Sequence, residues 1–164
     1  MKKIVIINGT GGCGKDTFVD ICSKYKKVYN FSSIDSVKEI ARIIGWNGTK
    51  SDKDRKFLSD LKKLTTDYND FAFNSIKDAI NIFNKSNDEL MFIHIREPEE
   101  IKKVVDKFKV KTLLIKRQNQ ELIETNSSDA NVEDYNYDYI IINTTLDEYE
   151  NKAVNFIKEL ENDK

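Results

Sequence analysis

One short segment near the start of the chain, GTGGCGKDT at residues 9–17, constrains the fold more than any other. It follows the apolar, β-branched run KIVIIN at 3–8, which is typical of a strand buried on both faces. Beyond the segment, apolar residues recur at helical spacing, at Phe18, Ile21, Cys22 and Tyr25. The sequence therefore predicts a strand, a glycine-rich turn and a helix in direct succession.

The alternation of strand and helix continues along the chain. Apolar runs predict further strands at residues 27–32, 90–95, 110–116 and 137–143. Helical spacing of apolar residues predicts helices that include 34–44, 57–68, 73–83, 101–108 and 146–160. This pattern predicts the α/β class, with three layers in which a five-stranded, mostly parallel sheet carries helices on both faces.

Length and spacing indicate how the chain is organised. Its 164 residues fit a single domain over 1–164, interrupted by a long helical insertion at 33–86. The insertion lies between the second and third predicted strands. We therefore expect it to cover one side of a ligand site at the carboxyl edge of the sheet.

The composition excludes several classes of protein. The 27 basic and 28 acidic residues give a formal net charge of −1, which argues against a dedicated nucleic-acid binder. No apolar run approaches the ~20 residues that a bilayer-spanning helix needs. The two cysteines have neither disulfide-framework nor zinc spacing. We expect a cytoplasmic monomer or homodimer whose partners are small molecules, with neither nucleic acid nor membrane among them.

The glycine-rich segment predicts a binding site for phosphate groups. Gly9, Gly14 and Lys15 match the pattern G-x-x-x-x-G-K, in the required context of a strand before and a helix after. Glycines let backbone N–H groups converge at the helix N-terminus, and Lys15 can place its charge on β- and γ-phosphates. The alternative is a turn that only joins strand and helix. The candidate nucleotide-binding residues of the segment are Gly9, Gly11, Gly12, Cys13, Gly14, Lys15, Asp16 and Thr17.

Asp16 stands where the strict motif has a hydroxyl residue that binds Mg²⁺. An acid is favoured at a helix N-terminus, but beside phosphates it is repelled unless a cation lies between them. We hypothesise that Asp16 contacts Mg²⁺ directly or through water. The alternative is that Asp16 only caps the helix, and Thr17 then donates to a phosphate oxygen.

The segment GTGGCGKDTF resembles the loop of small P-loop kinases that carry G-K-D-T, best known among the phage-type deoxynucleoside monophosphate kinases. A phosphomevalonate kinase group also uses G-K-D. Three further stretches are similar to the first family in order and spacing, at residues 30–41, 92–101 and 126–143. The resemblance implies a nucleoside monophosphate kinase-like fold, which is a three-layer P-loop NTPase fold. It also implies ATP with Mg²⁺, and a deoxynucleoside monophosphate as acceptor.

The sequence departs from that family at several positions. Ser36 replaces a proline, His94 stands where the family has an aspartate that helps to hold the water of Mg²⁺, and Asn126 stands where it has a histidine. His94 is the only histidine, and its place in an apolar strand favours a satisfied core imidazole over a proton shuttle.

Arginine is rare in this lysine-rich chain. Because a guanidinium can bind a phosphate through two parallel hydrogen bonds, each arginine is a candidate phosphate-binding residue. Arg96 directly follows the third strand and is assigned to the acceptor phosphate or the transferring phosphoryl group; the alternative is an ion pair with Glu99 or Glu100. Arg117 opens the polar segment 117–131, where the resembling family has a lid that carries arginine over ATP.

Candidate acceptor-binding residues cluster after the second strand. Ser33, Asp35 and Lys38 follow it directly, with Asp35 a candidate for the acceptor's sugar or base and Lys38 for its phosphate. Asp35 is alternatively a first-turn acid of the next helix, and Lys38 a surface lysine. The remaining candidates lie on predicted helices, where a solvated face or core packing is the alternative, and they are Arg42, Arg55 and Tyr68.

Together these residues predict a kinase that transfers phosphate from ATP to a (deoxy)nucleoside monophosphate. Lys15, Arg96 and Arg117 are the expected catalytic residues, which neutralise charge with Mg²⁺ while the two phosphates lie in line. Two alternatives stay open. One is a kinase for another small phosphorylated metabolite, such as phosphomevalonate, and the other is a nucleotide-binding regulator that has lost turnover.

Overall fold

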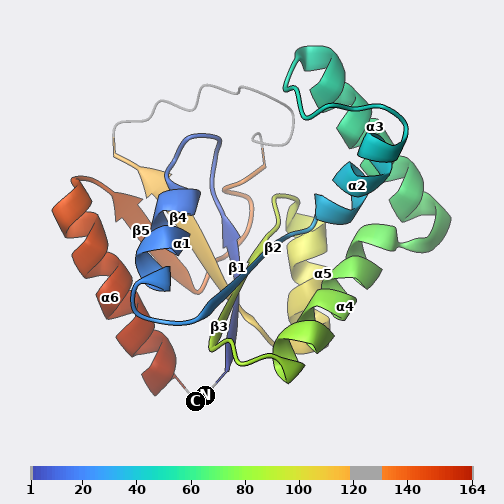
Figure 1. Cartoon of the computed structure of the whole chain (residues 1–164). Coiled ribbons are helices and arrows are strands. Elements are labelled where there is room, and N and C mark those ends of the chain that lie inside the picture. The colour runs from blue at the N-terminus through green and yellow to red at the C-terminus, as the bar shows by residue number, and fades with distance from the viewer. Residues whose placement is uncertain (1, 119–130, 164) are drawn as a thin grey trace. The chain divides into compact units, whose positions relative to one another are not determined.

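A computed structural model of the chain describes residues 2–118 and 131–163. Its sheet has the strand order β2–β3–β1–β4–β5, and β1 pairs in parallel with both β3 and β4, as β4 does with β5 (Figure 1). The strands are β1 Lys3–Asn8, β2 Val28–Ser32, β3 Leu90–His94, β4 Lys111–Arg117 and β5 Tyr139–Asn143. The predicted α/β class and five-stranded sheet are confirmed, and the predicted strand bounds differ by at most two residues.

Helices α1 (Lys15–Ser23) and α6 (Leu146–Asn162) cover one face of the sheet (Figure 1). Phe18 of α1 is fully buried at their junction, with ring-centroid distances of 5.5 Å to Tyr149 and 5.6 Å to Phe156 of α6. It also meets Phe92 of β3 edge-on at 6.2 Å. These aromatic contacts join the helix that follows the glycine-rich segment to both the sheet and the C-terminal helix.

Helix α5 (Pro98–Phe108) lies on the opposite face of the sheet (Figure 1). It begins with Pro98 in its first turn, where proline's missing N–H would have had no helical partner. Its buried residues Ile101 and Val104 carry the predicted apolar stripe. The prediction of helices on both faces is therefore confirmed.

The chain divides into two compact units, one made of residues 1–30 and 86–164 and the other of 31–85. The second unit holds α2 (Asp35–Ile43), α3 (Asp52–Asn69) and α4 (Phe71–Lys85), which pack on one another. Its bounds lie close to those predicted for the helical insertion. Helix α3 begins with a reciprocal capping box, in which Ser51 and Asp54 each bond the other's backbone N–H.

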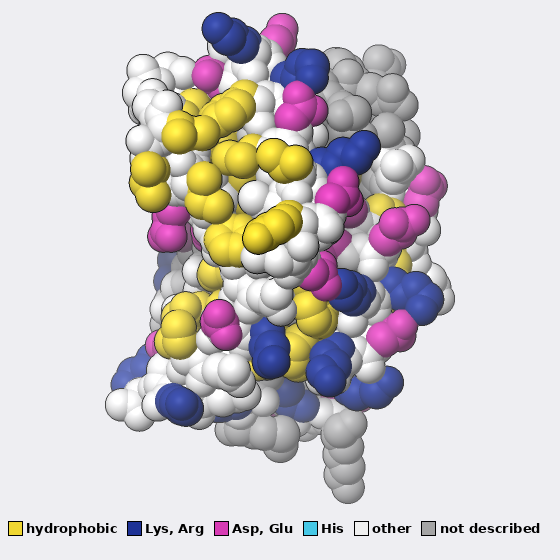
Figure 2. Space-filling model, turned by 90° about the vertical axis from the view of Figure 1, so that its right-hand side faces the viewer, with side chains coloured by type: hydrophobic (Ala, Val, Ile, Leu, Met, Phe, Trp, Pro, Cys, Tyr) yellow, Lys and Arg dark blue, Asp and Glu magenta, His cyan; other side chains and the backbone are white. Residues whose placement is uncertain are grey.

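The predicted apolar stripe of α3 is wrong in its second half. Leu64 is 67% exposed and Tyr68 86% exposed, and the buried residue of this helix is Leu58. Core packing is therefore excluded for Tyr68. Hydrophobic side chains gather on the surface shown in Figure 2, and the second unit has large exposed hydrophobic residues at Ile43, Ile44, Leu64, Tyr68 and Ile82.

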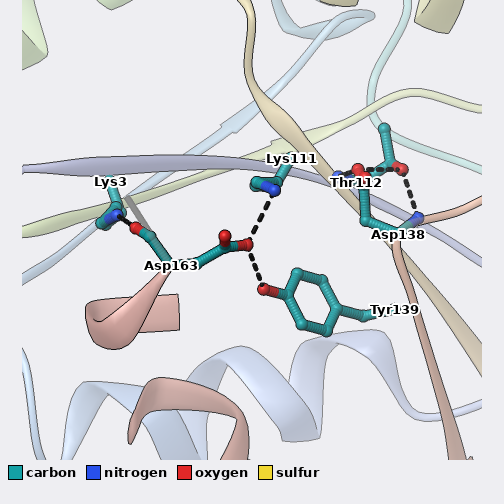
Figure 3. Close-up of polar contacts among 6 residues, drawn as sticks. All are labelled: Lys3, Lys111, Thr112, Asp138, Tyr139 and Asp163. Atoms are coloured by element: carbon teal, nitrogen blue, oxygen red, sulfur yellow. Dashed lines mark hydrogen bonds and ion pairs between the residues drawn. The ribbon is translucent and has the colours of Figure 1, made fainter. Parts of the chain in front are cut away.

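At the amino edge of the sheet, charged and polar side chains fasten the C-terminal end of the described chain (Figure 3). The carboxylate of Asp163 accepts from Lys111 Nζ at 2.7 Å and from the Tyr139 hydroxyl at 2.9 Å, and its backbone carbonyl accepts from Lys3 Nζ. These contacts hold the residue after α6 against the first residues of β1, β4 and β5.

No helix within residues 2–118 and 131–163 combines the length and the apolar character that crossing a membrane requires.

Candidate active site

The glycine-rich segment follows β1 as a tight loop whose shape depends on glycine at two positions. Gly9 has φ +151°, and a Cβ there would lie 2.5 Å from both Cys13 Sγ and the backbone oxygen of Ile115. Gly14 has φ +100°, and a Cβ there would lie 2.4 Å from Asn143 Nδ2. The loop therefore passes so close to β4 and β5 that side chains at these positions would collide with them.

Lys15 is the first residue of α1, and its ammonium group turns back over the loop. Lys15 Nζ donates to the backbone oxygen of Gly9 at 2.6 Å and of Thr10 at 3.0 Å. These acceptors are neutral, so they hold the side chain without cancelling its charge. A phosphate bound by the loop would meet a lysine already directed toward it.

The N-terminus of α1 is arranged for an anion. Its N-cap is Gly14, which has no side chain to bond the first-turn N–H groups. Asp16 and Thr17, the next residues of that turn, are exposed. Uncapped N–H groups and the helix dipole both favour negative charge at this point.

Cys13 packs into the core instead of facing the loop's open side. Its side chain is fully buried, and its Sγ lies 3.7 Å from Lys15 Nζ. Burial raises the pKa of the Cys13 thiol, an effect that the nearby Lys15 charge only partly offsets. The thiol therefore stays protonated and unreactive at neutral pH, and only the backbone of Cys13 is left to serve a ligand.

Three polar side chains that the sequence analysis did not select hold the loop in place. Asn143 Nδ2 donates to the Cys13 carbonyl at 3.1 Å, and the Tyr149 hydroxyl donates to the Gly14 carbonyl at 2.8 Å. Asn8 Oδ1 accepts from the Gly9 N–H at 2.8 Å. The sequence held an indication of Asn8 and Asn143, because the apolar strands KIVIIN and YIIIN each end in one of these asparagines.

Arg117, the last residue of β4, also contacts the glycine-rich loop. Its Nη1 donates to the Gly12 carbonyl at 3.4 Å. A hollow beside it is lined by Thr10, Leu114, Ile115, Lys116, Arg117, Val132 and Glu133. Arg117 thus contacts the glycine loop, and its predicted role in nucleotide binding stays a prediction. Most of the predicted lid at 117–131, with Asn126, lies outside the described residues.

Arg96 and His94 lie at the carboxyl end of β3. The Arg96 carbonyl accepts from Asn8 Nδ2 at 3.1 Å, which fixes the backbone of Arg96 beside the start of the loop. His94 Nε2 is 2.8 Å from Asn30 Oδ1 of β2. His94 is only half-buried, so it is hydrogen-bonded as expected but does not lie in the core.

Apart from Arg96, which belongs to the first unit, the predicted acceptor residues lie in the second unit. Asp35 is an acid in the first turn of α2, and its Oδ2 accepts from the Ser32 N–H, which lies before the helix, at 2.9 Å. The Arg42 guanidinium lies 5.3 Å from the centre of the Trp46 ring. Ser33 is buried, with Lys62 Nζ 3.5 Å from its hydroxyl. Lys38 is half-buried, and the exposed residues are Arg42, Arg55 and Tyr68. Their contact with an acceptor stays a prediction.

The residues of the loop fit the phosphates of ATP and a magnesium ion. The loop curves tightly enough to exclude a Cβ at Gly9 and Gly14, and it presents the uncapped start of α1 and the charge of Lys15 to one point. Asp16 supplies one exposed carboxylate beside Lys15. Mg²⁺ in phosphate sites is usually held by one or two carboxylates together with phosphate oxygens, so a single acid suffices here.

Solved structures share this architecture at low sequence identity. A sugar kinase from Janibacter sp. HTCC2649 has a TM-score of 0.55 at 13% identity, covering 96% of this chain and 95% of the other. Shikimate kinase from Aquifex aeolicus has a TM-score of 0.52 at 11% identity, covering 98% and 99%. A putative kinase from Chloroflexus aurantiacus has a TM-score of 0.55 at 11% identity, covering 96% and 94%. No family model and no curated protein matches the sequence.

The fold and the loop together define a class. The chain has the α/β fold seen in these kinases, and its glycine-rich segment occupies the turn between β1 and α1 with the form of a phosphate-binding loop.

Proposed function

We propose that this protein transfers the γ-phosphoryl group of ATP to a (deoxy)nucleoside monophosphate, giving the diphosphate. The observation that carries the proposal is the convergence of Lys15, the uncapped start of α1 and Arg117 on the glycine-rich loop. Positive charge and N–H donors from α1 and β4 lie at the same loop. This arrangement suits the triphosphate of a nucleotide better than any neutral ligand.

Catalysis in this class depends on positioning and charge, because the phosphoryl group in transit carries negative charge and forms few new covalent contacts with the protein. Lys15 would hold the β- and γ-phosphates, and Arg117 would bind from the β4 side. Arg96 would neutralise the acceptor phosphate or the transferring group. Asp16 would help to hold Mg²⁺, which supplies further charge neutralisation when bound.

The choice of a nucleoside monophosphate rests on the sequence. The G-K-D-T loop and the similar stretches at 30–41 and 92–101 point to deoxynucleoside monophosphate kinases. The second unit would supply the acceptor site, with Ser33 and Lys38 at its start as the residues to test. The sugar and shikimate kinases support the α/β kinase fold and leave the acceptor open.

The experiment is to measure ADP release from ATP and Mg²⁺ across the common deoxy- and ribonucleoside monophosphates, with phosphomevalonate included. Acceleration by one or a few nucleotides supports the proposal and identifies the substrate. Acceleration by phosphomevalonate alone moves the protein to the other G-K-D group. ATP binding without acceleration by any acceptor overturns the kinase proposal in favour of a nucleotide-binding regulator.

A parallel thermal-shift series with the same acceptors reports binding without turnover. The acceptor that raises the melting temperature in the presence of ADP should be the one that accelerates release. Disagreement between the two series would show that the stabilising compound is not the substrate.

A further inference from the structure

Asn8 is a buried amide with three hydrogen bonds, and it lies between two candidate phosphate-binding segments. It ends β1, is 0% exposed and directly precedes the glycine-rich loop. Its Oδ1 accepts from the Gly9 N–H at 2.8 Å, and its Nδ2 donates to the Arg96 carbonyl at 3.1 Å and to the Tyr137 hydroxyl oxygen at 2.8 Å. One backbone partner is only a donor and the other only an acceptor, so the orientation of the amide is determined.

Tyr137 extends this contact to a third segment. It is 7% exposed, and its hydroxyl donates to the Val132 carbonyl at 2.7 Å while accepting from Asn8. Burial raises the pKa of Tyr137 to about 12, so the phenol keeps its proton at neutral pH. The hydrogen bonds therefore run in one direction, from Asn8 through Tyr137 to Val132.

The hydrogen bonds of Asn8 and Tyr137, called the relay below, hold three backbone groups. These groups belong to different parts of the proposed site. Gly9 begins the phosphate-binding loop, Arg96 follows β3, and Val132 lies just after the polar segment that opens at Arg117. Each group is a main-chain atom, so the relay fixes the backbone of the three segments at the carboxyl edge of the sheet. Neutral amide and phenol groups do this without placing a negative charge beside bound phosphates.

We propose that Asn8 and Tyr137 are positioning residues, which keep the phosphate-binding loop, Arg96 and the chain at Val132 in register for phosphoryl transfer. The inference rests on the proposed function for its catalytic consequence. Its structural part, that loosening the relay at Tyr137 loosens the loop at Gly9, does not depend on which acceptor is used.

The test variant is Tyr137→Phe, and the matched control is Tyr135→Phe. The Tyr135 ring packs edge-on against the Tyr137 ring with centroids 5.2 Å apart, and the described residues give its hydroxyl no hydrogen bond. Both variants lose one phenolic oxygen from the same aromatic pair. Only Tyr137→Phe breaks the relay.

Hydrogen exchange read by mass spectrometry measures the structural part directly. In Tyr137→Phe, amide exchange should rise about 10-fold in peptides covering both 9–14 and 131–137, with ADP affinity lowered about 5-fold, whereas Tyr135→Phe should stay within about 2-fold of the parent. Faster exchange at 131–137 alone, or equal behaviour of the two variants, would overturn the relay.

Kinetics separate positioning from simple structural support. With the acceptor found in the nucleotide panel, Tyr137→Phe should lower kcat about 10-fold while the KM for that acceptor changes less than about 2-fold. A reduced melting temperature with unchanged kcat would reduce Tyr137 to a structural residue. If no acceptor is found, the proposed function fails, and exchange and ADP affinity still decide the relay.

A measurement on the unaltered protein guards against a variant that does not fold. ADP bound at the loop should slow exchange in the peptide covering 131–137 as well as in 9–14. Protection confined to the loop would overturn the coupling without any substitution.

Discussion

The two edges of the sheet use polar side chains in different ways. At the carboxyl edge, the neutral groups of Asn8, Asn143 and Tyr149 bond the backbone of the glycine-rich loop. At the amino edge, Lys111 and Asp163 form an ion pair whose side chains are both 37% exposed. The first arrangement fixes the shape of a loop with groups that carry no charge. The second holds Asp163 against the sheet, and the charges of Lys111 and Asp163 largely neutralise each other.

This difference teaches where substitutions should affect chemistry and where they should affect stability. A neutral hydrogen bond to a backbone carbonyl shapes the site without competing for phosphate. An exposed ion pair contributes little and is screened by salt. Changes at the carboxyl edge should therefore alter nucleotide binding and turnover, and changes at the amino edge should alter only the melting behaviour.

The largest expected effect is that of Lys15→Ala. Loss of the charge held over Gly9 and Thr10 should lower phosphoryl transfer at least ~100-fold, measured as acceptor-dependent ADP release. Lys24→Ala is the control, because Lys24 ends the same helix and pairs with Glu150 at 3.2 Å. Undiminished turnover in Lys15→Ala would contradict the assignment of the loop.

Gly9→Ala should damage the fold of the loop itself. The new Cβ would lie 2.5 Å from the Ile115 carbonyl oxygen, a backbone atom that cannot move aside, so unfolding free energy should fall by about 3 kcal/mol and nucleotide affinity with it. The matched control is Gly12→Ala, where φ is +74° but nothing lies within 4 Å, so strain alone should cost about 1 kcal/mol. Equal losses in chemical denaturation would show that contact with β4 does not constrain the loop.

Asp16→Ala tests the predicted contact of Asp16 with Mg²⁺. If Asp16 helps to hold Mg²⁺, the concentration of Mg²⁺ for half-maximal turnover should rise about 10-fold, because one hard oxygen ligand is removed. Asp20→Ala, an exposed acid of the same helix, should leave the titration unchanged. If Asp16→Ala gives an unaltered titration curve, Asp16 is only a helix-terminal acid.

The same chemical change can be made at both edges. Tyr149→Phe removes the hydroxyl that donates to the Gly14 carbonyl and should lower stability by about 1 kcal/mol, together with a weaker ADP affinity in calorimetry. Tyr139→Phe removes the hydroxyl that donates to Asp163 and should leave ADP affinity unchanged. An equal loss of affinity in both variants would contradict the division between the edges.

The smallest effect is expected for Asp163→Asn at the amino edge. Lys111, and next the Tyr139 hydroxyl, lower the pKa of the Asp163 carboxyl below its ordinary 3.8. A lowered folded-state pKa gives stabilisation that is present above the ordinary value and is lost as the pH falls through the folded-state value. Asp163→Asn should lower Tm by about 2 °C at pH 7, with the difference shrinking as the pH falls below the ordinary 3.8 of the carboxyl. A difference that persists at acid pH would show that charge is not its cause.

Local pattern predicted much of this protein. The run of apolar residues before Gly9 and the helical spacing after Lys15 were sufficient to predict β1, the loop and α1, because each depends on neighbours a few positions away. Arg117 was a candidate through the resemblance, because the similar family has an arginine-bearing lid at this place, and in the structure it contacts the Gly12 carbonyl.

Other features depended on packing that periodicity does not encode. The spacing of Leu64 and Tyr68 matched a buried stripe, yet both are exposed, and Leu58 is the buried residue of α3. Cys13 lies in the loop by sequence, but its side chain belongs to the core. Helical spacing shows which residues share a face, and only the neighbouring elements determine which face is covered.

By itself the sequence determined the order of elements, the glycine-rich loop between β1 and α1 and the position of Lys15 at the start of the helix, because these follow from short-range backbone sterics and spacing. The tertiary structure alone decided which side chains hold that loop. Asn143 meets the Cys13 carbonyl 130 positions away, and Tyr137 meets Asn8 across 129. Hydrogen bonds of this kind need two buried partners to arrive at one point. Only the packing of strands and helices around the sheet brings such distant residues together.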